Sequence, residues 1–165
     1  MYALTAATLA LAGAALAAPT LQARDGSQFS LHATGGPLTG WAIVNAHIAA
    51  GKNTIQIQRP SAYVSDTSFL NGTNLYFDLH TNVPYGVEMP NVPAGTVGQV
   101  FSQPGEMSTG FGINAGQLLT YNSNPEGFWA CPVDNTFELF YGLNPEPANL
   151  PSSECQRIEL QAARS

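Results

Sequence analysis

Three histidines are the first residues in this sequence that could bind a metal ion or transfer a proton: His32, His47 and His80. His32 and His80 fall at polar positions of segments in which apolar and polar residues alternate, so we expect exposed histidines on strands there. The histidine spacing does not match a metal-binding motif such as HExxH, and the two cysteines are too far apart for a CxxC pair. We therefore predict neither a metal site nor a cofactor.

Paired carboxylates are the second arrangement that could do chemistry, because a glycosidase needs two of them about 5–10 Å apart. The candidates are Asp66, Asp78, Glu88, Glu106 and Glu126, and their spacing singles out no pair. We interpret them as solvated surface acids. The sequence contains neither a GxSxG motif nor a glycine-rich phosphate loop before a helix. These observations predict a protein that has no catalytic residues and is not an enzyme.

Tryptophan side chains could bind a sugar, because an aromatic face packs well against the polarised C–H groups of a sugar ring. Trp129 lies two residues before Cys131 in an apolar run, and we predict a core role for it. Trp41 follows a glycine turn at the start of another apolar run. Its position leaves both a core and a binding role open, and Trp41 is our candidate carbohydrate contact.

Residues 1–18 have the pattern of a secretory signal peptide. The segment is nearly all Ala, Leu and Gly without charge, and Ala15 to Ala17 form a small-x-small cleavage site before Ala18-Pro19. A membrane helix is the alternative, but the apolar run is short and rich in alanine rather than leucine. We expect cleavage near Ala18, a flexible N-terminal arm over residues 19–28, and secretion to the outside of the cell.

Several features suit an extracellular protein. An even pair of cysteines in a secreted chain predicts a disulfide between Cys131 and Cys155. Asn71 begins an Asn-Gly-Thr sequon at a hairpin-type turn, so we predict that it is glycosylated. The net charge is −6 with five Lys and Arg residues, and there is no basic patch. Such a chain is expected to repel nucleic acid, and we predict no membrane contact after signal cleavage.

The elements that would position these residues are short strands. Apolar and polar residues alternate over residues 29–34, 55–58 and 75–80, and a short strand is expected around Tyr63 and Val64. About ten to twelve strands, with turn signals about every 8–12 residues, predict one all-β domain over residues 29–165. We expect a compact antiparallel β-sandwich or small β-barrel. A β-trefoil is the alternative, because residues 110–143 resemble one trefoil lobe.

The last third of the chain resembles a known group of proteins. It contains a Gly-Phe-Trp-Ala-Cys-Pro run over residues 127–132, an aromatic strand over residues 137–141, and then Cys155. This arrangement resembles the end of fungal PhiA-like cell-wall proteins, also called IgE-binding or phialide-type proteins. It is also similar to the C-terminal domain of Pir-type cell-wall mannoproteins. The chain departs from the Pir pattern, because it lacks their glutamine-containing repeats, part of their cysteine set and a dibasic processing site.

The resemblance implies a fungal, extracellular and non-enzymatic protein associated with the cell wall, with Cys131 and Cys155 as its structural pair. Our leading hypothesis is therefore a secreted fungal cell-wall structural protein, with wall polysaccharide or mannoprotein as its partner. A carbohydrate-binding module is the alternative. A small secreted glycan hydrolase is less favoured, because the sequence contains no acid–base pair at a suitable spacing.

Overall fold

The structure is a computed structural model, and it describes residues 27–61 and 63–164. The predicted signal peptide and most of the predicted N-terminal arm lie outside the described residues. Within them the chain forms thirteen strands and two short 3-10 helices, η1 (Gly36–Leu38) and η2 (Pro147–Asn149). The strands are β1 (Phe29–Thr34), β2 (Ala42–Ala49), β3 (Lys52–Gln58), β4 (Thr67–Asn71), β5 (Asn74–Asp78), β6 (Tyr85–Glu88), β7 (Gly98–Gln99), β8 (Phe101–Pro104), β9 (Phe111–Ile113), β10 (Leu119–Tyr121), β11 (Phe128–Val133), β12 (Thr136–Tyr141) and β13 (Gln156–Arg164).

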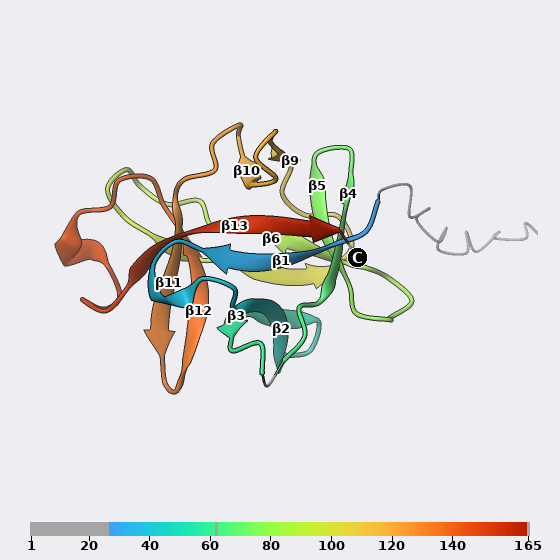
Figure 1. Ribbon diagram of the computed structural model, residues 1–165, viewed down its shortest axis with the longest axis horizontal. Helices are drawn as coiled ribbons and strands as arrows, with labels where there is room; N and C mark the ends of the chain where they lie inside the picture. Colours follow the sequence, from blue (N-terminus) through green and yellow to red (C-terminus); the bar gives the residue numbers. More distant parts are fainter. Residues whose placement is uncertain (1–26, 62, 165) are drawn as a thin grey trace, which may run out of the picture.

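Nine of these strands close into an antiparallel β-barrel. Around the ring the order is β1, β4, β5, β6, β8, β3, β12, β11 and β13, and β13 then pairs again with β1. In Figure 1, β1 and β13 run side by side across the front of the barrel. The prediction of a compact all-β fold is confirmed in its barrel form. The β-trefoil alternative is not observed, because this strand order does not repeat three times around the ring.

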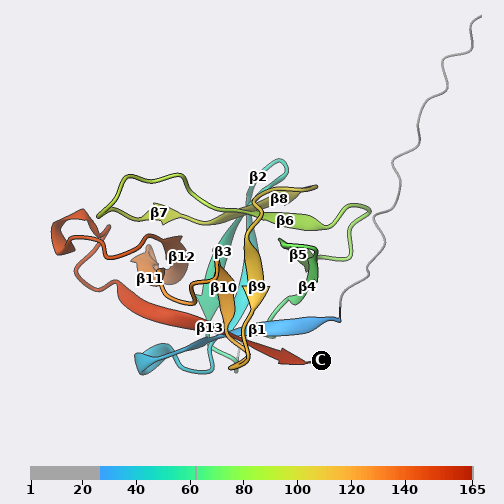
Figure 2. The same cartoon turned by 90° about the horizontal axis from the view of Figure 1, so that it is seen from above.

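The remaining strands extend and cover the barrel. β2 forms a hairpin with β3 and touches β1 through the pair of His32 with Ala42. β7 pairs with residues 140–141 at the end of β12, beyond the residues that pair with β3. β9 and β10 form a separate hairpin that lies across the middle of the view in Figure 2. Phe111 and Leu119 of this hairpin are buried in the same core as the barrel strands. The hairpin therefore closes one side of the barrel.

The barrel interior is filled by apolar side chains. Inward positions alternate along the strands, and Leu31, Ile43, Ile55, Phe128 and Leu160 are almost completely buried. The free space at the centre is about 10 Å³, which is about the space that one water molecule needs. A barrel this full has no internal cavity for a ligand. Within the part of the chain that the structure describes, the hollows large enough for a sugar-sized ligand lie at the surface.

The strand predicted around Tyr63 and Val64 is not observed. Both side chains are exposed, at 51% and 89%, and no strand spans them. Tyr63 instead donates its backbone N–H to the carbonyl of Arg59, which turns the chain after β3. Ser65 and Asp66, which follow Val64, are held by side-chain hydrogen bonds. The Ser65 hydroxyl donates to the Leu31 carbonyl, and the Asp66 carboxylate accepts from the side-chain amide of Asn45. This segment is thus a crossing loop held by polar side chains.

The alternation predicted over residues 75–80 is only partly correct. β5 ends at Asp78, and all five of its residues are buried. Tyr76, which the alternation places on the same face as Asp78 and His80, stacks on Phe69 of β4 with ring centroids 5.3 Å apart. His80 lies beyond the strand with a φ of 57°. Both faces of this strand are covered, so it has no solvent-facing side.

The predicted disulfide is present. Cys131 of β11 is bonded to Cys155, which immediately precedes β13, with an S–S distance of 2.12 Å and a sequence separation of 24 residues. Residues 128–130 of β11 also pair directly with residues 156–158 of β13. The bridge therefore holds the last strand of the chain, which closes the ring between β11 and β1.

Among the described residues, no helix has the length and apolar character needed to span a membrane.

Candidate functional site

His32 lies between two serines on the outside of the barrel. Its ring nitrogens lie 3.0 Å from Ser30 Oγ and 3.4 Å from Ser65 Oγ. The Ser65 hydroxyl donates a hydrogen bond to the Leu31 carbonyl at 2.7 Å and accepts one from the Ile43 N–H at 3.2 Å. A serine nucleophile needs its proton directed at a base. The Ser65 proton is instead used to hold the backbone of β1.

A second polar cluster occupies the end of the barrel where β2, β3 and β8 meet. The Asp66 carboxylate accepts hydrogen bonds from the backbone N–H of Asn45 at 2.6 Å and from its side-chain amide at 2.9 Å. The Ser102 hydroxyl donates a hydrogen bond to Asn45 Oδ1. In the same region His47 Nδ1 lies 3.3 Å from Asn53 Oδ1. This network, which the sequence pattern did not predict, satisfies its own polar groups. It therefore joins the loop that carries Asp66 to β2 and β8.

The predicted carboxylates do not converge. Glu126 forms an ion pair with Arg157 at 2.6 Å, Glu88 accepts a hydrogen bond from Gln103, and Glu106 is exposed. The interpretation as surface acids is wrong for Asp78, which is buried and accepts a hydrogen bond from the backbone N–H of His80 at 3.1 Å. Among the described residues, no group of three or more His, Cys, Asp or Glu side chains could hold a metal ion.

One buried carboxyl was missed by the sequence analysis. Glu138 lies on the outer side of β12, where it accepts a hydrogen bond from Gln99. Burial raises the pKa of Glu138 above its ordinary value, and the hydrogen bonds of Thr54 and Gln56 oppose this effect. The nearby charge of Asp134 also raises the pKa, by a smaller amount. The Gln99 amide also binds Thr54 Oγ1 at 2.9 Å, so Glu138 is one member of a polar row on the sheet surface.

Trp129 does not have the core role that was predicted for it. On β11 the inward positions are Phe128 and Ala130, which join the apolar core, so Trp129 points to the outer side and is half-buried. Its indole N–H donates a hydrogen bond to the Gly142 carbonyl at 3.1 Å. The side chain therefore anchors the chain after β12.

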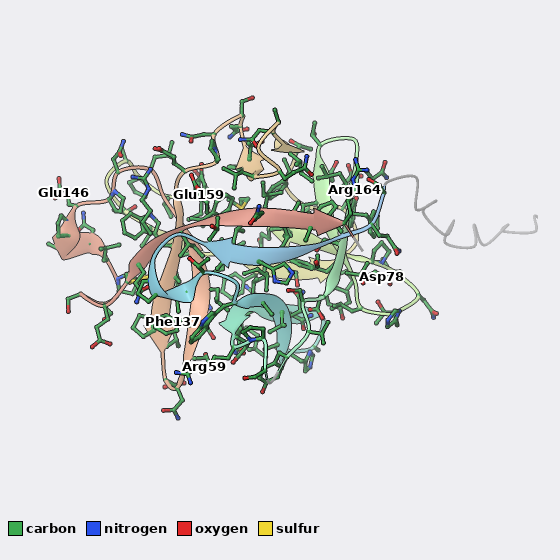
Figure 3. All side chains as sticks on the ribbon, in the orientation of Figure 1. Arg59, Asp78, Phe137, Glu146, Glu159 and Arg164 are labelled. Atoms are coloured by element: carbon green, nitrogen blue, oxygen red, sulfur yellow. A yellow bond between two sulfur atoms is a disulfide. The ribbon has the colours of Figure 1, made fainter. Side chains whose placement is uncertain are left out.

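Trp41 lies in an open groove of about 370 Å³ at the edge formed by β3 and β12. Figure 3 shows two of the lining residues, Arg59 and Phe137, near each other on the lower side of the barrel. We call this hollow the Trp41 groove, and its lining residues are Trp41, Ile57, Gln58, Arg59, Asn135, Thr136 and Phe137. Aromatic rings, two amides, a hydroxyl and a guanidinium thus meet on one surface.

The backbone fixes the two aromatic rings of the groove. The residue before Trp41 is a glycine with φ of 83°, and the Trp41 N–H donates to the carbonyl of Leu38 at 3.0 Å. Phe137 stands opposite Ile57 in the pairing of β12 with β3. The Trp41 and Phe137 rings meet edge to face, with centroids 6.0 Å apart. Each ring restrains the other, so the apolar part of the groove is already formed in the free protein.

Arg59 completes the groove from the residue after β3. Its guanidinium carbon lies 5.3 Å from the centroid of the Trp41 ring, which is within the range of a cation–π contact. Arg59 itself is exposed. The prediction that Trp41 could contact carbohydrate remains a prediction. The structure adds Arg59, Phe137 and Asn135 to its surroundings, and the sequence analysis proposed none of them as a ligand contact.

A second hollow of about 410 Å³ is less suited to a polar ligand. It lies between residues 90–94 and residues 141–143, and its aromatic residues are Tyr121 and Tyr141. Tyr141 is buried against Phe128, with ring centroids 5.3 Å apart, and burial followed by the effect of Tyr121 raises its pKa. Most of the remaining lining is proline, alanine, valine and leucine. The Trp41 groove offers more groups that could recognise a hydroxylated ligand.

The fold and the groove define a class of protein: a disulfide-bonded, closed antiparallel β-barrel with a filled interior and a polar, aromatic groove on its surface. Residues 25–163 match the family model described as "Domain of unknown function (DUF7907)", and the chain therefore belongs to that family. No curated protein and no solved structure matches the chain.

Proposed function

We propose that this protein is a secreted, non-enzymatic protein of the fungal cell wall that associates with wall polysaccharide through the Trp41 groove. The observation behind this proposal is the convergence of Trp41 and Phe137 with the polar groups of Gln58, Arg59 and Asn135. The resemblance of the last third of the chain to fungal wall proteins supports the compartment. The groove supports the mode of association.

The chemistry of the groove suits a sugar ring. A sugar has apolar C–H faces and a rim of hydroxyl groups, so it needs an aromatic surface flanked by hydrogen-bonding groups. Trp41 and Phe137 supply the aromatic surface. The amide of Asn135 and the oxygen of Thr136 lie on the rim, where hydroxyl groups of a bound sugar would meet them. Because the barrel interior is full, such a surface groove is the kind of site that this fold can offer.

The hydrolase alternative has less support. Retaining and inverting glycosidases both use two carboxyl groups that face one bond. The Glu138 carboxyl is hydrogen-bonded to an amide on the outer side of β12, whereas Phe137 turns its ring to the Trp41 groove. Of the five acids considered in the sequence analysis, whose spacing singled out no pair, Asp66, Glu88 and Glu126 bind different partners. We therefore propose retention on a polymer without turnover of that polymer.

Binding to insoluble wall polymers tests the proposed function. The secreted protein would be incubated with β-glucan, chitin and mannan particles, and the bound fraction measured together with any release of reducing sugar. We expect retention on at least one polymer without sugar release, and a loss of affinity of about tenfold for Trp41→Ala, which corresponds to about 1.4 kcal/mol. Melting temperatures of wild type and variant would establish that the fold is retained.

Leu143→Ala is the matched control, because Leu143 is an exposed apolar residue that lines the second hollow. This variant should bind like the wild type. Retention that Leu143→Ala abolishes and Trp41→Ala leaves unchanged would move the site to the second hollow. Steady release of sugar from one of the polymers, abolished by changing one carboxylate, would favour the hydrolase instead.

A further inference from the structure

Arg59 lies in the Trp41 groove without an acidic partner. Lys52, which contacts the Phe101 ring, and Arg164 likewise have no ion pair with a described residue, but neither of them lines a groove that contains a tryptophan. The protein has eleven Asp and Glu residues against five Lys and Arg residues, so carboxylates are plentiful. Arg157 uses one of them in its ion pair with Glu126. Arg59 contacts the Trp41 ring instead, and it has no ion pair with any of the residues that the structure describes. Its charge is thus directed into an open groove.

The position of Arg59 on the indole leaves its hydrogen-bonding capacity available. A guanidinium has five N–H donors in one plane, and packing over a ring uses its face rather than its edge. The adjacent Asn135 adds an amide on the groove rim. Thr136 donates its hydroxyl proton to the Val133 carbonyl at 3.3 Å, so this hydroxyl can serve a ligand only as an acceptor. The strongest unused donor in the groove is therefore Arg59.

We propose that the ligand of the Trp41 groove is an anionic glycan, whose carboxylate or phosphate group pairs with Arg59 while the sugar ring contacts Trp41 and Phe137. This inference rests on the proposed function and names the class of its ligand. Carboxylates and phosphates match the planar fork of a guanidinium and form charge-assisted hydrogen bonds with it. Uronic acids and phosphorylated mannose units share this chemistry, and the experiment separates them.

A neutral sugar fits the same groove less well. Arg59 lies over the Trp41 ring and Phe137 meets that ring edge to face, so a neutral sugar that stacks on the indole face held by Arg59 must displace the guanidinium. The displaced cation would then lose its contact without gaining another. An anionic sugar of the same shape meets the guanidinium in the same way, but its carboxylate or phosphate gives Arg59 a charge-assisted partner in place of the ring contact. The arrangement therefore favours a negatively charged ligand over a neutral one of the same shape.

Asp134 is the acidic residue nearest in sequence to the groove rim. It occupies the turn between β11 and β12, next to Asn135, with a φ of 52°. It does not line the groove. Its negative charge opposes the binding of an anion, so Asp134→Asn should strengthen binding of an anionic glycan. Asparagine tolerates a positive φ, which makes this change a mild one for the backbone.

Calorimetric titration of the full-length secreted protein tests the ligand class. One arm compares oligogalacturonate with its methyl-esterified, neutral form, and the other compares a phosphorylated oligomannoside with its dephosphorylated form. We expect at least one charged probe to bind about tenfold more tightly than its neutral counterpart. Arg59→Gln should remove this preference, Arg59→Lys should keep part of it, and Trp41→Ala should weaken charged and neutral forms alike. The arm that shows the preference identifies the source of the negative group.

Arg157→Gln is the matched control, because it removes the same charge from an exposed arginine that already has a partner. Its preference should equal that of the wild type. Equal binding of charged and neutral probes, or a preference that survives Arg59→Gln, would overturn this inference. If neutral polymers still bind through Trp41 in that case, the proposed function stands without it. If neither the oligosaccharides nor the wall polymers bind, both proposals are wrong.

Discussion

At the scale of single residues, Glu138 gives the barrel a pH-dependent stability. Its pKa is raised above the ordinary value of 4.5 in the folded protein, first because it is buried. The folded state then holds the proton at pH values where the unfolded chain has released it. The resulting stabilisation is fully present below the unfolded pKa and is lost as the pH rises through the folded pKa. An acidic medium would thus favour the folded state at this position.

Glu138→Gln should remove this dependence, because glutamine is neutral at every pH and similar in shape. We expect the melting temperature of the variant, relative to wild type, to rise as the pH increases from about 4 to 8. Differential scanning calorimetry across this range would measure it. Glu126→Gln is a suitable control, since Glu126 lies in an exposed ion pair. Parallel curves for wild type and Glu138→Gln would contradict the prediction.

At the scale of elements, the β4–β5 hairpin presents the sequon. Asn71 is the last residue of β4 and pairs with Asn74, so Gly72 and Thr73 form the turn. The positive φ that this turn requires is supplied by Gly72, at 59°, and both turn residues are exposed. The half-buried Asn71 therefore stands at the base of an exposed tip.

We predict that Asn71 carries a glycan when the protein is made in a eukaryotic secretory pathway. Asn71→Gln and Thr73→Ala should both increase gel mobility by the same amount, because each removes the sequon. Thr73→Ser keeps the sequon and should migrate like the wild type. Enzymatic removal of N-glycans should bring all four proteins to the same mobility. A wild type that already migrates with Asn71→Gln would show that the site is unused.

The strands also show why the alternation of apolar and polar residues predicted some elements correctly and others wrongly. β1 and β3 have one apolar and one more polar face, so period-two alternation predicted them. β5 is covered on both faces, and alternation therefore misplaced Tyr76 and His80. A strand was also expected around Tyr63 and Val64, where hydrogen bonds from side chains hold a loop instead.

The Trp41 groove illustrates the same limit for the candidate site. The glycine turn before Trp41 marked this residue as a candidate contact. Arg59 and Phe137 join it because β12 pairs with β3, and these strands are far apart in the sequence. Local patterns carry no information on such a pairing. The charge of the groove could therefore be recognised only after the barrel was assembled.

At the scale of the whole molecule, closure of the barrel depends on its last strand. β13 pairs with both β11 and β1, so it joins the two ends of the ring. A ring that opens there would expose two strand edges, which pair readily with other chains. The bond between Cys131 and Cys155 holds the start of β13 beside β11. The disulfide thus stabilises the closed ring of strands as well as the loop between the two cysteines.

We predict that loss of this bond destabilises the barrel and promotes association. The sequence separation of 24 residues corresponds to about 3–3.5 kcal/mol in the chain-entropy model. For a domain of this size the melting temperature should fall by about 10 °C. Chemical denaturation of Cys155→Ala, with light scattering during heating, would measure both effects. A reductant should lower the stability of the wild type to a similar extent and should have no further effect on Cys155→Ala, because that variant has no bond to reduce. A variant that unfolds at the wild-type denaturant concentration would show that strand pairing alone holds β13 in the ring.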